Sequence, residues 1–192
     1  MKKEIQLCAE VLRGGGTILY PTDTIWGIGC DATDPEAVAK VYGIKGRVDS
    51  KAMLVLVDSV DRIYEYVEEI PEMALEILNL QHELQYDKPL TIVYPGAIGL
   101  ADNLVAADGS IGIRISSEIF SKELIRVFGK PLVSSSANVA GQPAPANFSE
   151  IPGDIRKAVD YVVKWGQDDH KKRKPSGILK VSLNGEIEVI RQ

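Results

Sequence analysis

The sequence contains 192 residues, a length typical of one globular domain. Hydrophobic residues make up 45% of it and charged residues 26%, which excludes a collagen, a coiled coil and a disordered chain. Twenty-two basic residues against 27 acidic ones give a net charge of −5, which disfavours nonspecific coating of nucleic acid. The apolar run at Ala52–Val57 is far too short to cross a bilayer, and the charged N-terminal stretch does not resemble a secretory signal. We therefore expect one cytoplasmic domain spanning residues 1–192, with no membrane contact.

Cysteine and histidine are too scarce for several common catalytic arrangements. Cys8 and Cys30 are the only cysteines, and His82 and His170 are the only histidines. A closed zinc site and a Cys–His nucleophile pair are therefore not expected, and we predict no protein metal site. The two cysteines are expected to pack as small apolar groups, and acid–base work must come from other side chains.

The first half of the chain predicts helices alternating with strands. Apolar residues at helical spacing predict a helix over residues 5–12, ended by Gly14–Gly16, and a strand follows at Thr17–Tyr20. Asp34 and Pro35 are typical of an N-cap and first helical residue, so a helix is expected from there to about residue 43. A buried strand is expected at Ala52–Val57. A helix opens at Pro71, and its predicted core face consists of Met73, Ile77, Leu80 and Leu84.

The second half adds more strands than helices. Leu90–Tyr94 and Ser110–Ile115 are strand-like, a helix over residues 120–128 ends at Gly129, and Leu132–Val133 begins another strand. Three further short strands are expected at Tyr161–Lys164, Gly177–Val181 and Glu186–Ile190. This pattern predicts an α/β or α+β domain built around one twisted, mixed sheet with flanking helices.

The stretch Gly27–Ala32 matches the dinucleotide-binding pattern G-x-G-x-x-G/A. In that motif the glycines directly follow the first strand, whereas here Pro21–Trp26 intervenes. A nicotinamide site is therefore disfavoured, and no Walker A sequence is present, so a nucleotide would be held in another way.

Four segments could carry chemistry, and each also has an ordinary structural explanation. Pro21–Gly29 is either a plain turn or a cleft edge rich in hydroxyl groups, and Lys45–Lys51 is either a solvated cluster or a phosphate clamp. Ser134–Gly141 is either an N-cap region or a set of neutral donors for phosphate oxygens. Arg114, flanked by isoleucines in a strand, requires an anion on its face of the sheet, supplied by a structural ion pair or by a ligand.

Together these segments resemble the YrdC-like family of threonylcarbamoyl-adenylate synthases over nearly the whole chain. The family pattern P-T-[DE]-T-[VI]-Y-G-[LI]-G is similar to Pro21–Gly29, with Trp26 at the tyrosine position. K-x-R corresponds to Lys45 and Arg47, and S-x-N to Ser136 and Asn138. Later landmarks correspond to Ser110 with Arg114, Pro175–Ser176 and Arg191.

The resemblance implies a twisted α/β sheet with a concave, positively charged cavity. It implies a reaction that joins L-threonine, bicarbonate and ATP into threonylcarbamoyl-AMP and releases pyrophosphate. Mg²⁺ is expected to accompany ATP as a substrate complex, and downstream tRNA-modifying proteins then transfer the threonylcarbamoyl group to tRNA. The implied threonine-binding residues are Thr24, Arg114, Ser134 and Ser176. The implied ATP-binding residues are Arg47, Lys51, Ser110, Ser136, Asn138 and Arg191, with Lys45 and Arg47 as catalytic residues of the phosphate clamp.

Two alternatives remain open at this point. A non-catalytic RNA-binding module, for tRNA or double-stranded RNA, is motivated by the basic run Lys171–Lys174, which is otherwise a solvated loop. A paralogue acting on a different substrate is the second alternative, because Leu56 stands where many family members place a histidine near threonine. Leu56 is expected to face the amino-acid pocket, unless it is sealed in the core, where a histidine would be destabilising.

Overall fold

A computed structural model describes residues 1–46, 53–84 and 88–192. The described residues form one nine-stranded sheet with the order β7-β1-β2-β6-β3-β5-β4-β8-β9, in which parallel and antiparallel pairs are mixed. The predicted class, an α/β fold around a mixed sheet, is therefore confirmed. The strands are β1 (Ile18–Tyr20), β2 (Gly27–Gly29), β3 (Leu54–Val57), β4 (Leu90–Tyr94), β5 (Ile111–Ile115), β6 (Leu132–Ser136), β7 (Tyr161–Val162), β8 (Gly177–Val181) and β9 (Ile187–Arg191).

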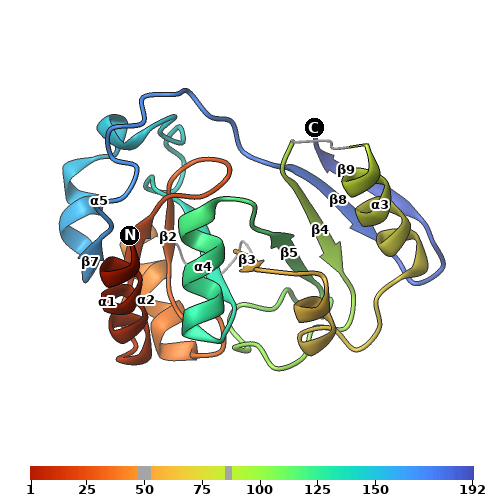
Figure 1. Cartoon of the computed structure of the whole chain (residues 1–192). Helices are drawn as coiled ribbons and strands as arrows, with labels where there is room; N and C mark the ends of the chain where they lie inside the picture. The colour runs from red at the N-terminus through yellow and green to blue at the C-terminus, as the bar shows by residue number, and fades with distance from the viewer. Residues whose placement is uncertain (47–52, 85–87) are drawn as a thin grey trace.

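The helices flank this sheet, with α3 beside the β8–β9 edge and α4 in front of its middle (Figure 1). They are α1 (Lys2–Arg13), α2 (Pro35–Lys45), α3 (Glu72–Glu83), α4 (Ile119–Phe128) and α5 (Gly153–Ala158), with short 3-10 turns at Asp61–Glu65 and Phe148–Glu150. The described residues contain no helix long and apolar enough to cross a membrane.

Local capping explains where the best predicted helices begin and end. The Asp34 carboxylate accepts hydrogen bonds from the backbone of Glu36 and Ala37, as expected of an N-cap, and Pro35 is the first helical residue. At the other end of α2, Gly46 adopts a left-handed conformation with φ 61°. Gly129 closes α4 in the same way, with φ 83°. These helix ends are therefore specified by nearby side chains and glycines.

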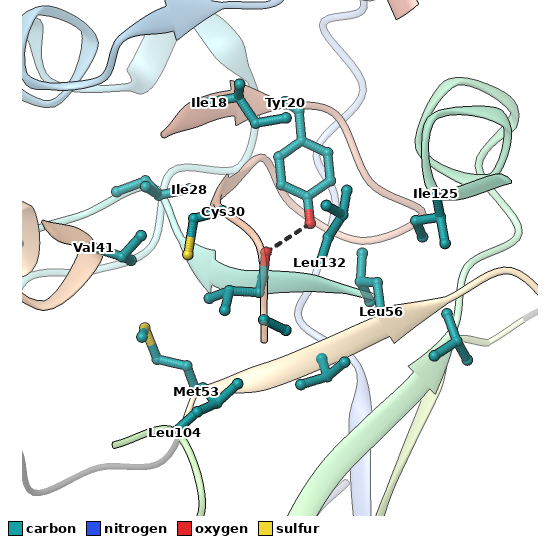
Figure 2. Close-up of a cluster of buried hydrophobic side chains, with 14 of the residues drawn as sticks. Ile18, Tyr20, Ile28, Cys30, Val41, Met53, Leu56, Leu104, Ile125 and Leu132 are labelled. Atoms are coloured by element: carbon teal, nitrogen blue, oxygen red, sulfur yellow. Dashed lines mark hydrogen bonds between the residues drawn. The ribbon is translucent and has the colours of Figure 1, made fainter. Parts of the chain in front are cut away.

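The two glycines of the Gly27–Ala32 segment lie in strand β2 and do not form a phosphate-binding turn. β2 pairs antiparallel with β1, and the Tyr20 ring lies across Gly29, where an added Cβ would come within 2.5 Å of the ring. The Tyr20 hydroxyl donates to the Val133 carbonyl at 3.1 Å, a bond drawn within the core cluster of Figure 2. The glycines therefore make room for a buried tyrosine, and this packing excludes the dinucleotide motif.

Two residues of helix α3 are not in the core as expected, and two elements of the fold were not predicted. Leu80 and Leu84, predicted to be core residues, are 54% and 67% exposed, whereas the neighbouring Ala74 is fully buried. Helical periodicity shows that a face is apolar, but it does not show whether another element covers it. Helix α5 and strand β2 were not predicted, because one is short and the other is two-thirds glycine.

Candidate functional site

A cavity of about 410 Å³ opens on one face of the sheet. The register explains why residues far apart in sequence share it, because paired residues in neighbouring strands point to the same face. Leu54 pairs with Ser134, and Ile178 pairs with Arg191, and all four line the cavity. Eight of the predicted binding residues line it: Thr24, Ser110, Arg114, Ser134, Ser136, Asn138, Ser176 and Arg191.

Arg114 is the most deeply buried charge of the cavity wall. Its guanidinium lies 3.0 Å from the Asp23 carboxylate, and the two side chains are only 3% and 5% exposed. Its Nη2 also donates a long, 3.5 Å hydrogen bond to Thr22, while its Nε has no hydrogen-bond partner among the described residues. Arg114 therefore has the structural counter-charge that one of the two explanations requires, and its buried Nε has no hydrogen-bond partner among the described residues.

Arg191 reaches the cavity from the edge strand β9. Its Nε donates to the Ser176 carbonyl at 2.8 Å, and Ser176 Oγ lies 2.8 Å from the hydroxyl of Thr91. Partial burial, and then the charge of Arg114, lower the pKa of Arg191. Arg114 and Arg191 are the only charged side chains among the described residues that line the cavity. Two guanidinium groups in one cavity make a site in which an anion is stabilised.

Thr24 belongs to a small hydroxyl network in the loop between β1 and β2. The Thr22 hydroxyl donates to the Ile25 carbonyl at 2.7 Å and lies 3.0 Å from the Thr24 hydroxyl. Because the single proton of Thr22 is used, Thr24 is the donor of that pair. Thr24 therefore offers lone pairs to the cavity and can accept a hydrogen bond from a ligand.

Lys45 stands behind the cavity wall. It is fully buried at the end of α2, and its ammonium donates to the Ser136 carbonyl, to Ser136 Oγ at 3.3 Å and to Asn138 Oδ1 at 3.4 Å. The Asn138 amide in turn donates to the carbonyls of Val139 and Gln142. Lys45 therefore fixes the turn that carries two predicted ATP-binding residues, and its catalytic role stays a prediction. Arg47 and Lys51 lie outside the described residues.

Ser110 lines the cavity at the start of β5 and has a charged partner that sequence analysis missed. Its hydroxyl donates to Asp108 Oδ1 at 2.6 Å, and Lys180 donates to Asp108 Oδ2 at 2.6 Å. The hydrogen bonds from Lys180 and then from Ser110 hold the pKa of Asp108 well below its ordinary value. Asp23, paired with Arg114, was also missed, although a strand arginine already indicated that an anion had to be found.

Leu56 does not line the cavity, so the expectation that it faces a pocket is wrong and the alternative, that it is sealed in the core, is confirmed. It lies on the same face of the sheet as Leu54, but it is fully buried and does not line the cavity. Figure 2 shows it among Tyr20, Leu132 and Ile125, the last a residue of α4. Strand β3 therefore runs from the cavity, at Leu54, into the core beneath α4.

Nothing in the described part of the chain forms a cluster of three or more acidic, histidine or cysteine side chains that could hold a metal ion. Cys8 and Cys30 are both buried, and burial raises the pKa of the Cys8 thiol to about 12. The groups that this cavity offers are therefore hydroxyls, amides and arginines. Such groups suit the binding and alignment of anionic substrates.

Comparison with known proteins assigns this α/β chain to a protein family. The model of the Sua5/YciO/YrdC family, described as telomere recombination, matches residues 10–192. The chain belongs to this family.

Individual relatives agree with this assignment. The threonylcarbamoyl-AMP synthase of Stutzerimonas stutzeri is 34% identical over 95% of this chain and 95% of its own length. The putative threonylcarbamoyl-AMP synthase of Methanocaldococcus jannaschii is 33% identical over 94% of this chain and 81% of its own. The crystal structure of P. abyssi Sua5 complexed with L-threonine has the same fold, with a TM-score of 0.79 at 22% identity. It matches over 92% of this chain, which spans 50% of that longer chain.

Proposed function

We propose that this protein is an enzyme that synthesises threonylcarbamoyl-AMP from L-threonine, bicarbonate and ATP. The amino nitrogen of threonine attacks the carbon of bicarbonate and water leaves, which gives N-carboxythreonine. One oxygen of its carbamate group then attacks the α-phosphorus of ATP. The new P–O bond forms as the bond to the β-phosphate bridging oxygen breaks, and pyrophosphate leaves. Two relatives at 33–34% identity that carry this activity in their names support the proposal.

The observation that carries the proposal is that Arg114 and Arg191 line the same cavity. The other described residues that line it have neutral side chains. In this reaction an anion attacks an anionic phosphate, so the protein must chiefly neutralise charge and align two substrates. No covalent nucleophile is required, which is consistent with the burial of both cysteines.

The threonine end of the cavity is assigned to Thr24, Arg114, Ser134 and Ser176. An arginine can bind a carboxylate with two parallel hydrogen bonds, and Arg114 lines the cavity. The lone pairs of Thr24 suit the amino or hydroxyl group of threonine. These groups hold the amino acid while its carbamate oxygen meets the α-phosphate.

The ATP end is assigned to Ser110, Ser136, Asn138 and Arg191, together with Arg47 and Lys51. Lys45 and Arg47 are proposed as the catalytic cations. Lys45 orders the Ser136–Asn138 turn, where its charge lies close behind the phosphate-binding groups. Mg²⁺ fits this site as a companion of ATP, held mainly by phosphate oxygens and water, where it would neutralise charge on the leaving pyrophosphate.

The direct test is a pyrophosphate-release assay on the purified protein. Release is expected only when ATP, threonine, bicarbonate and Mg²⁺ are all present. Release without bicarbonate would contradict the proposed reaction. Replacing threonine with serine or valine tests the paralogue alternative, which is supported if another amino acid is clearly the better substrate.

A tRNA acceptor and the downstream tRNA-modifying proteins complete the proposed pathway. A second cavity, of about 540 Å³, lies next to the first, since Thr24 and Trp26 line both. Its wall includes Lys171 and Arg173 of the basic run, although Arg173 is paired with Asp169. The alternative RNA-binding module predicts salt-dependent RNA affinity without pyrophosphate release, which the same preparation can test.

A further inference from the structure

The hydrogen bonds of Ser110 determine what its hydroxyl can offer to a ligand. Ser110 Oγ donates to Asp108 Oδ1 at 2.6 Å, and the backbone N–H of Ser110 donates to the same oxygen at 3.1 Å. The other carboxylate oxygen accepts from Lys180 at 2.6 Å. An ionised carboxylate has no proton to give, so Ser110 must be the donor to Asp108.

A serine hydroxyl carries one proton, and here that proton is used. Toward the cavity, Ser110 therefore presents only lone pairs. Ionised phosphate oxygens are also acceptors only, so a hydrogen bond between them and Ser110 is excluded while Asp108 keeps its charge. Because Lys180 contacts the carboxylate, it holds Asp108 in that state.

The cavity surface around Ser110 suits the nucleoside part of ATP. Ser110, which directly precedes β5, and Gly112 and Arg114 within β5 are alternate residues that all line the cavity, with Gly112 between the two polar side chains. Gly112 has no side chain that would fill this part of the cavity, and a Cβ there would come within 3.3 Å of Thr91 Cγ2. Val93 pairs with Gly112 and also lines the cavity, so the surface beside Ser110 is apolar. An apolar surface next to a lone acceptor favours a base or ribose over a triphosphate.

We propose that Asp108 and Lys180 fix Ser110 as an obligate acceptor, which takes a hydrogen bond from a donor on the nucleoside of ATP. That donor is the exocyclic amine of adenine or a ribose hydroxyl. Ser110 contacts the nucleotide, and Asp108 is a positioning residue that acts through it. This inference rests on the proposed use of ATP and adds which part of ATP is recognised at this position.

The test is a calorimetric comparison of wild-type protein and Ser110→Ala with ATP, inosine triphosphate, 2′-deoxy-ATP, 3′-deoxy-ATP and inorganic tripolyphosphate. Wild type is expected to bind one of the three analogues about 3- to 10-fold more weakly than ATP, because one hydrogen bond is lost. Ser110→Ala should bind ATP as weakly as that analogue and should not discriminate between the two. Inosine triphosphate tests the exocyclic amine of adenine, and the two deoxy analogues test the two ribose hydroxyls.

Asp108→Ala frees the Ser110 proton. This variant should therefore show a smaller difference in affinity between ATP and the weakly bound analogue. A merely structural role would weaken all five ligands together. Asp102→Ala is the matched control, because Asp102 is an exposed carboxylate of the same loop. Unfolding temperatures check that the variants are folded.

Several results would overturn the inference. One is a loss of tripolyphosphate affinity in Ser110→Ala, and another is an equal loss for every nucleotide. If wild type releases pyrophosphate but Ser110→Ala still prefers ATP over the analogue as strongly as wild type does, the inference alone fails. If wild type binds no ATP, the inference and the proposed function fail together.

Discussion

The two arginines of the cavity are held in very different ways. Arg114 is in a central strand, almost fully buried, with its charge opposite Asp23. Arg191 is in the edge strand β9, whose five residues are all exposed, and its Nε binds a backbone carbonyl. A buried pair fixes geometry but makes each partner costly to remove, whereas an edge residue can be changed with little effect on the fold. Replacing the central arginine is therefore expected to change both ligand binding and stability, whereas replacing the edge arginine should change mainly ligand binding.

The largest effect is expected for Arg114→Ala, which leaves Asp23 buried without its counter-charge. We expect a loss of about 3 to 5 kcal/mol in the free energy of unfolding, measured with urea. Arg126→Ala is the control, because its ion pair with Glu123 is on the surface and its loss should leave stability nearly unchanged.

Two further variants separate stability from binding at this position. Adding Asp23→Asn to Arg114→Ala should recover part of the loss, because the unpaired charge is removed. Arg114→Lys should remain folded and raise the threonine KM about tenfold without changing ATP affinity, because the two-pronged contact is lost. A stable Arg114→Ala variant with normal threonine use would contradict both roles.

The next effect is expected for Leu56→His, which buries a polar ring in the core beneath α4. Stability should fall by about 2 to 4 kcal/mol, and the threonine-over-valine preference should not change. Leu54→His, two residues earlier on the same face but lining the cavity, should cost less. A stable Leu56→His variant with altered selectivity would show that this position does reach the substrate.

A smaller effect is expected for Gly29→Ala, at the most tightly packed point of the β1–β2 pair. The new methyl group would meet Tyr20 Cε1 at 2.5 Å and the Val133 carbonyl at 2.6 Å, so a cost of about 1 to 3 kcal/mol follows. Gly43→Ala, in helix α2 with open space around it, is the control and should stabilise the protein by up to about 1 kcal/mol. Equal melting temperatures for the two variants would contradict this packing.

The smallest effect on stability is expected for Arg191→Ala, less than about 1 kcal/mol. ATP affinity should nevertheless fall by about 10- to 150-fold, because a charge-assisted contact is lost. Calorimetry with ATP measures this change, and Glu188→Ala in the same exposed strand is the control. Unchanged ATP affinity would remove Arg191 from the ATP-binding set.

The sequence predicts features that depend on neighbouring residues better than those that depend on distant ones. Asp34, Pro35 and Gly129 define helix ends through local hydrogen bonds and backbone conformation, so these ends are predictable. The exposure of Leu80 and the glycine-rich strand β2 depend on which element lies opposite, and no local pattern records that.

The site divides in the same way. Arg114 can be found from the sequence because a charge flanked by isoleucines stands out in a strand, and Ser110 is indicated by the family resemblance. The partner of Arg114 cannot, because Asp23 is 91 positions away in sequence. Asp108 is only two positions from Ser110, but the Lys180 that pairs with Asp108 is 72 positions away. The buried position of Lys45 likewise depends on contacts with a turn more than 90 residues away.

The position of β7 also has a consequence for how the chain folds. β7 pairs with β1, and Thr17 donates hydrogen bonds to Asp160, 143 positions later. At a synthesis rate of about 5 to 20 residues per second, β1 waits roughly 7 to 30 s for this partner to be made. During that time its outer edge is an unpaired apolar strand, which can associate with other chains. Such non-local pairing slows folding, so we expect this protein to refold far more slowly than a helical bundle of the same length.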